Sequence, residues 1–264
     1  NALRLEKGNA QIMRDLALLQ AQCHDWEGFA ETRRELLVLK PSGRQNWITF
    51  AVATHLAGRH AEALDIVGKY EKTLEQLPPE GEEYEHSELQ MYKAMVMEEG
   101  GDKEGALKLL AEGEAHIVDR LGLAETRARL LAEMGDTAGA AEAYRALVDR
   151  NPDHRGYNEA LCEAKGLAGD AAGLQALYAE LQERHPKAVA PRRVPLDFLE
   201  GAAFEAALER YMRPFLLKGV PSLYSDLSGL QADAEKCAAM TRVIAATVNA
   251  LRADQRFAGA TVEG

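Results

Sequence analysis

A turn signal recurs along this chain at a spacing of 34 residues, with one interruption. The dipeptide Gly-Asp repeats in phase, and two related turn dipeptides hold the same register upstream: His24-Asp25, Gly58-Arg59, Gly101-Asp102, Gly135-Asp136 and Gly169-Asp170. A period of this length indicates one short supersecondary unit stacked on copies of itself. Each unit then buries its apolar face only against its neighbours, which restricts the chain to repeat architectures.

The register shifts once, by nine residues, between Gly58 and Gly101. The surplus falls in the acidic stretch 77–85, where the consecutive prolines Pro78 and Pro79 predict a loop, because proline interrupts a helix interior. The acidic residues of this stretch do not have the spacing of an EF-hand calcium loop, so we interpret it as a solvated loop.

The residue types within each period indicate a pair of packed helices. Glycine at the turn supplies the left-handed backbone conformation that ends a helix. Small residues stand early in the second helix, where two backbones approach each other, at Ala63, Ala106 and Ala140. Prolines follow the second helix and stop it, at Pro41, Pro152 and Pro186. Period and residue types together resemble the tetratricopeptide family over residues 9–186.

We therefore predict an all-helical fold, a tetratricopeptide-repeat solenoid of antiparallel helix pairs. Five repeats are expected within residues 1–186, with helix pairs at 9–22/25–39, 43–57/60–76, 84–99/103–118, 121–134/137–150 and 154–168/171–184. Beyond Pro186 the period is lost, and residues 187–264 are predicted to continue as irregular helices over 203–217, 222–231 and 234–252. Pro191 and Pro195 predict an extended stretch over 188–196, because proline is excluded from helix interiors.

No pattern of reactive residues predicts a catalytic centre, a bound cofactor or a metal site. The three cysteines lie far apart without a CxxC pair, which fits neither a zinc finger nor a disulfide framework. The seven histidines are scattered, mostly at turns and helix ends, and we interpret them as surface or capping residues. The motifs GxxxxGK[ST], HExxH and GxSxG are missing. The chain is therefore not expected to be an enzyme.

Charge and hydropathy limit the possible partners. The formal net charge is −11, whereas direct binding to DNA requires a basic footprint. No apolar run approaches the ~20 residues that a membrane span needs. We therefore expect protein partners rather than DNA or a membrane.

One basic cluster interrupts the acidic chain where the repeats end. Arg192 and Arg193 lie between two prolines, and Lys218 lies just beyond the next predicted helix. These side chains have two interpretations: they cap carbonyl groups at the end of the fifth repeat, or they anchor the acidic surface of a partner. The structural interpretation is preferred, because a repeat array must fix the angle at which regular repeats give way to irregular ones.

Several segments carry a more specific resemblance. Residues 9–58 and the sequence YEHSEL at Tyr84–Leu89 resemble the auxiliary, scaffolding subunit of the N-terminal acetyltransferase A complex. The densest similarity lies in Pro191–Leu227, whose proline-bracketed arginine pair and Lys-Gly-Val-Pro-Ser sequence are not features of regular repeats. The family protein is longer, and this chain resembles an N-proximal to central segment of it.

This resemblance implies a non-catalytic scaffold without a cofactor. The family's subunit binds and positions a catalytic partner of the GNAT acetyltransferase fold, which uses acetyl-coenzyme A to acetylate nascent chains during translation. The implied location is cytoplasmic, with ribosome contact through the full-length protein. The alternative is a generic tetratricopeptide adaptor that binds peptides or helices in its concave groove.

Overall fold

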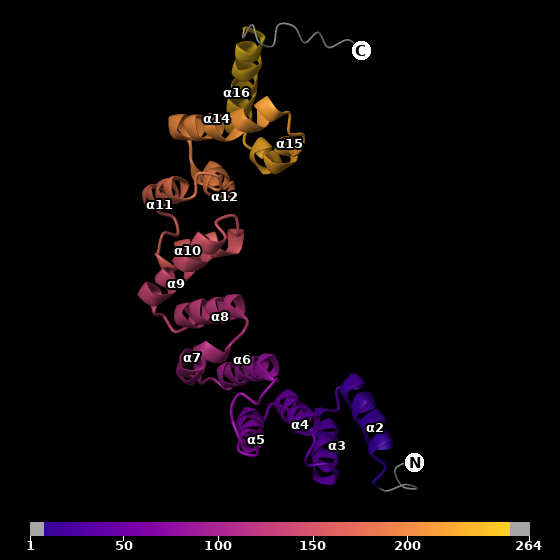
Figure 1. Cartoon of the computed structure of the whole chain (residues 1–264). Helices are drawn as coiled ribbons and strands as arrows, with labels where there is room; N and C mark the ends of the chain where they lie inside the picture. The colour runs from indigo at the N-terminus through magenta and orange to yellow at the C-terminus, as the bar shows by residue number, and fades with distance from the viewer. Residues whose placement is uncertain (1–7, 254–264) are drawn as a thin grey trace. The chain divides into compact units, whose positions relative to one another are not determined.

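The computed structural model describes residues 8–253, and the outer parts of the two predicted domains, 1–7 and 254–264, lie outside the described residues. All regular secondary structure within residues 8–253 is helical (Figure 1), which confirms the predicted all-α fold class of tetratricopeptide type. Backbone contacts divide the chain into two compact units, Asn1–Gly135 and Asp136–Gly264. The predicted division at residue 186, between regular and irregular repeats, remains a prediction. None of the described helices is long and apolar enough to cross a membrane.

The first unit is a series of helices in which each packs against the next in sequence (Figure 1). They are α2 (Ala10–Gln22), α3 (Trp26–Leu39), α4 (Arg44–Leu56), α5 (His60–Glu71), α6 (Glu83–Glu99), α7 (Lys103–Glu112), the short 3₁₀ helix η1 (Glu114–His116) and α8 (Arg120–Glu133). Two helices of this unit, α5 and α7, end several residues before the predicted positions, and so does α10 (Arg155–Ala164) in the second unit, which was predicted at 154–168. After α5, the Thr73 hydroxyl donates to the Tyr70 carbonyl at 2.7 Å, which competes with helix continuation, and α7 stops before Gly113.

The small residues predicted for the helix contacts are buried. Ala63 and Ala106 in the first unit and Ala140 in the second are all 0% exposed. Ala106 belongs to an apolar cluster with Ala94 of α6, Leu110 of α7 and Leu123 of α8. A larger side chain at these positions would displace a neighbouring helix, because protein interiors are close-packed.

An aspartate caps the first turn of several helices, and its bonding partner is the glycine three residues later. The capping residues are Asp25, Asp102, Asp119, Asp136 and Asp170. Each carboxylate accepts a hydrogen bond of 2.9–3.0 Å from the backbone N–H of that glycine. A Cβ on any of these glycines would lie only 2.2–2.4 Å from the aspartate Oδ2, so glycine permits the close cap. The turn dipeptides of the sequence thus also mark helix starts.

The second unit continues with helices of less uniform length (Figure 1). They are α9 (Thr137–Arg150), α10 (Arg155–Ala164), α11 (Ala171–Arg184), α12 (Ala190–Arg193), α13 (Pro195–Phe198), α14 (Gly201–Lys218), α15 (Ser222–Asp226), the 3₁₀ helix η2 (Ser228–Ala232) and α16 (Ala234–Ala253). The apolar core of the irregular part includes Leu196, Phe204, Leu208 and Met240. It joins α13, α14 and α16.

The extended stretch predicted over 188–196 is wrong, because this segment forms the two short helices α12 and α13. Pro191 and Pro195 both lie in a first helical turn, where the missing N–H of proline has no intrahelical partner to lose. Asp153 Oδ1 accepts the N–H groups of Val189 and Ala190 at 2.7 and 2.8 Å. The side chain thereby holds the start of α12 against the preceding repeat.

Candidate functional site

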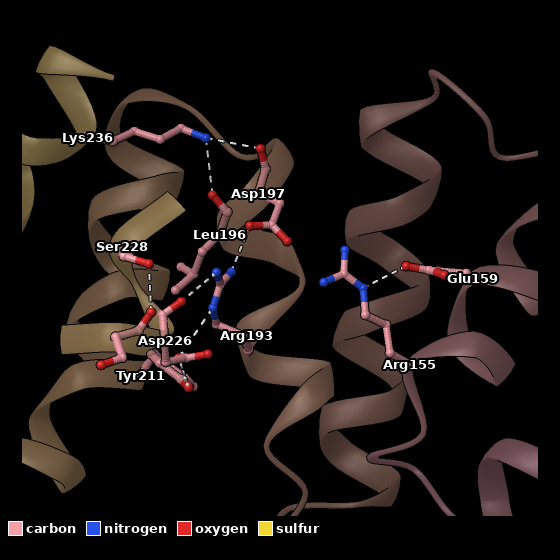
Figure 2. A network of polar contacts seen from close by, with 10 residues as sticks. Arg155, Glu159, Arg193, Leu196, Asp197, Tyr211, Asp226, Ser228 and Lys236 are labelled. Carbon is pink, nitrogen blue, oxygen red and sulfur yellow. Dashed lines mark hydrogen bonds and ion pairs between the residues drawn. The ribbon is translucent and has the colours of Figure 1, made fainter. Parts of the chain in front are cut away.

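Arg193 is the centre of a polar network in the second unit (Figure 2). It is the last residue of α12, and its side chain is only 18% exposed. Nη1 donates to Asp197 Oδ1 at 2.7 Å, and Nη2 donates to the backbone carbonyl of Asp226 at 3.1 Å. Nε lies 3.3 Å from Asp226 Oδ2. One guanidinium therefore connects the α12–α13 corner to the end of α15.

Asp226 has a second partner that extends this network to α14. The Tyr211 hydroxyl donates to Asp226 Oδ2 at 2.6 Å, and Tyr211 is 3% exposed (Figure 2). Burial and then the hydrogen bond to the Asp226 carboxylate raise the pKa of Tyr211 above its ordinary value. The phenol thus stays neutral and remains a donor at physiological pH.

Arg192 contacts different groups, although it is the neighbour of Arg193. Its Nε donates to the Ala188 carbonyl at 2.9 Å, and Nη2 donates to the Lys187 carbonyl at 3.4 Å. Both carbonyls lie in the turn that follows α11, outside any regular helix. This is the geometry that carbonyl capping requires, and it leaves the side chain partly exposed.

Lys218 shares no contact with the arginine pair in the described part of the chain. It is the exposed last residue of α14, and within residues 8–253 it has no hydrogen bond or ion pair. The helix ends there because Gly219 adopts the left-handed conformation, with φ of 63°. A lysine in the last turn interacts favourably with the partial negative charge of the helix end. The three predicted basic residues therefore have no partner in common.

Lys236 of α16 is a second anchor, which the sequence analysis did not find. Its Nζ donates to the carbonyls of Leu196 and Asp197 at 3.1 and 3.0 Å, and it lies 5.1 Å from the centre of the Phe204 ring (Figure 2). The contacts span 39 and 40 residues of sequence, so no local motif indicates them. Arg193 of α12 and Lys236 of α16 thus both donate hydrogen bonds to the short helix α13.

An open apolar hollow of about 320 Å³ lies among α14, α15 and α16. Met212, Leu216 and Met240 contribute to its lining, and Tyr224 at its edge is 72% exposed. Exposed apolar surface of this kind is typical of places where a protein or ligand binds. The hollow therefore offers a contact surface rather than a reactive centre.

The residues with reactive side chains are mostly engaged in structural contacts. Burial raises the pKa of the Cys162 thiol, whose Sγ lies 3.7 Å from the Tyr178 hydroxyl, so the reactive thiolate is disfavoured. His154 caps α10, and His185 at the end of α11 lies 2.9 Å from an Asp149 carboxylate oxygen, as expected for histidines at helix ends. His55 differs from this pattern, because it is buried beside the carboxylate of another helix.

Two sequence comparisons, one with a family model and one with known proteins, agree on one family. Residues 84–263 match the model of the family described as N-terminal acetyltransferase A, auxiliary subunit. The chain is 40% identical to the N-terminal acetyltransferase A complex auxiliary subunit NAA15 of Arabidopsis thaliana, over 100% of this chain and 30% of that protein. It is 37% identical to the mouse (Mus musculus) N-alpha-acetyltransferase 16, NatA auxiliary subunit, over 92% of this chain and 28% of that protein. The chain thus spans less than a third of the length of these relatives.

One solved structure is similar to this chain in both sequence and fold. It is described as Naa15/Naa10 bound to HypK-THB, and the match has a TM-score of 0.87 and 38% sequence identity. It covers 94% of this chain and 37% of that chain. The similarity therefore includes the irregular helices as well as the regular repeats.

Proposed function

Because this chain belongs to the family of auxiliary subunits of N-terminal acetyltransferase A, we propose that it is a scaffold that binds and positions a GNAT-fold acetyltransferase subunit. The observation that carries the proposal is the 40% identity to an auxiliary subunit across the whole chain, together with the similarity to Naa15 solved with Naa10. The family assignment confirms the prediction of an auxiliary rather than a catalytic subunit. The partner then supplies the acetyl-coenzyme A site, and this chain supplies the surface that binds and orients the partner.

In our proposal, the two arginines stabilise the conformation of the scaffold rather than contact the partner. The guanidiniums of Arg192 and Arg193 are directed at carbonyls and carboxylates of their own chain, at distances of 2.7–3.4 Å. Lys218 is exposed and is the predicted residue that an acidic partner surface can reach. The apolar hollow beside α15 supports a role in binding, since its exposed Tyr224 gives a partner both apolar and polar contact.

The proposal extends to the setting in which the family works. Family membership supports co-translational acetylation of nascent chains, a cytoplasmic location and ribosome contact through the full-length protein. The same membership favours a dedicated acetyltransferase scaffold over the alternative of a generic adaptor for peptides or helices in a groove. A generic adaptor would bind short peptides without any acetyltransferase subunit, and this separates the two roles experimentally.

Co-purification tests the proposed function. The full-length protein that contains this sequence is expressed with a tagged GNAT-fold subunit, and we expect the two to purify together and to acetylate a peptide that begins with Ser. The chain without that subunit is expected to transfer no acetyl group. Failure of the full-length protein to retain the GNAT subunit contradicts the scaffold role, and turnover by the purified chain alone contradicts its non-catalytic nature.

A further inference from the structure

Three side chains with metal-ligating atoms meet in the first unit, and each comes from a different helix. His55 is the penultimate residue of α4, His60 is the first residue of α5, and Glu99 is the last residue of α6. Glu99 Oε2 lies 2.8 Å from His55 Nε2 and 3.9 Å from His60 Nε2. All three potential ligand atoms lie within 4.8 Å of one another.

These separations suit a small divalent ion. Imidazole and carboxylate ligands about 2.0–2.2 Å from a tetrahedral zinc ion are themselves roughly 3.3 Å apart. The distance from His55 to Glu99 is shorter than this because the two groups share a hydrogen bond, and the distance from His60 is longer. Side-chain movements of about 1 Å bring all three atoms to coordination distance.

A glycine lets the turn between α4 and α5 lie close to the end of α6. His60 follows the tight turn between α4 and α5, and Gly100 directly follows α6. A Cβ on Gly100 would lie 3.2 Å from the Cβ of His60. Gly100 has an ordinary φ of −74°, so its own conformation does not require glycine. The absence of a side chain serves the contact with His60.

The position of Glu99 at a helix end favours a cation between these side chains. Glu99 is the last residue of α6, where its negative charge is repelled by the partial charge of the helix end unless a cation offsets it. The Tyr92 hydroxyl is buried without a hydrogen-bond partner in the described part of the chain, and its ring meets the His55 ring edge-on at 5.6 Å. Arg59, the nearest arginine in the turn, instead pairs with Glu27 and Glu62.

We propose that His55, His60 and Glu99 bind a zinc-class divalent ion, with water in the fourth position. Two imidazoles and one carboxylate select a late first-row metal such as zinc, whereas calcium and magnesium prefer a shell of oxygen ligands. The ion ties the α4–α5 turn to the end of α6, across the loop 77–85 where the repeat register shifts. It acts as a clamp at that shift, and it does not depend on the acetyltransferase role.

Zinc titration of the purified protein tests the site. Calorimetry measures the affinity, and the visible absorption of cobalt, used as a probe, reports tetrahedral coordination. We expect saturable binding that raises the melting temperature, because an ion bound to the folded state stabilises it. His60→Gln and Glu99→Gln are each expected to weaken binding at least about tenfold. His24→Asn changes an exposed histidine outside the site and is expected to bind zinc as the wild type does.

We expect these variants to preserve the fold. Glu99→Gln retains a hydrogen-bonding group for His55, and His60 is 30% exposed, so circular dichroism is expected to show unchanged helix content. The absence of saturable zinc binding, or equal affinity in wild type, His60→Gln and Glu99→Gln, overturns the proposal.

Discussion

Replacement of Arg193 by Ala removes the side chain that links α12, α13 and α15, and we expect it to destabilise the second unit. The side chain is 18% exposed, whereas the carboxylates of Asp197 and Asp226 are each 41% exposed. A hydrogen bond to a charged group contributes about 1.5–3 kcal/mol, and solvent screening lowers the contribution of exposed ion pairs. We therefore expect a loss of about 1–3 kcal/mol in the free energy of unfolding.

Arg192→Ala is a matched control, because it removes the same side chain one position earlier. Arg192 donates to neutral carbonyls, at 2.9 and 3.4 Å, and the second of these bonds is long. Its loss is expected to cost about 0.5–1.5 kcal/mol. The order of the two effects follows from the structure, since only Arg193 connects segments that are 33 residues apart.

Urea unfolding followed by circular dichroism measures these differences as shifts in the transition midpoint. Co-purification with the GNAT-fold subunit is then compared under conditions in which all variants are folded. We expect Arg193→Ala to have the lower midpoint and still to capture the partner when folded. An Arg193→Ala protein that unfolds at the wild-type urea concentration but no longer captures the partner would refute this reasoning, and Arg193 would then be a partner anchor.

Three further predictions concern packing, capping and pH. Ala106→Leu overpacks the contact of α6, α7 and α8 and is expected to cost about 1–3 kcal/mol, and an unchanged melting temperature would show that the register of this repeat is wrong. Asp102→Ala removes the cap of α7 and is expected to cost about 0.5–2 kcal/mol in thermal unfolding, whereas Glu104→Ala in the same turn is expected to cost less. Burial and the charge of Glu99 raise the pKa of Tyr92 to about 12. Its contribution to stability is therefore complete below the unfolded pKa of about 10 and is lost as the pH rises toward 12. The absorbance of tyrosinate during alkaline titration checks this, and Tyr92→Phe is expected to flatten the loss of stability.

The starts of the helices in the regular repeats were predictable because they depend on local chemistry, whereas α5, α7 and α10 end earlier than predicted. Gly101 adopts φ of +92°, and the adjacent Asp102 caps α7, so both events are decided within a few positions of sequence. The helices predicted at 137–150 and 171–184 match α9 and α11 to the residue. A helix that starts with a capping aspartate and a nearby glycine can be recognised within a single repeat. The 34-residue period shows the same pattern again in the next repeats.

The irregular corner was less predictable because position, rather than composition, decides its conformation. Pro191 and Pro195 exclude a helix interior but not a first helical turn, and the sequence alone did not distinguish the two. The prolines did direct attention to the arginine between them that forms the network. Its partner Asp226, and the second anchor Lys236, lie far along the chain and carry no local signature.

The long-range charged contacts nevertheless keep the spacing of the repeat after the turn signal is lost. Charged contacts that join segments of the second unit separated by 33–37 residues occur in both its regular and its irregular part: Arg145 with Glu180, Arg184 with Asp149, Arg193 with Asp226, and Arg242 with Glu205. A stacked helix pair brings equivalent positions into reach once per unit, so facing charges fall close to one period apart. The short helices α12, α13 and α15 change the local path of the chain without changing this separation. Opposite charges about one period apart therefore mark candidate facing positions, but the spacing alone does not select the partner. Glu159 also lies 34 residues before Arg193, and it pairs instead with Arg155.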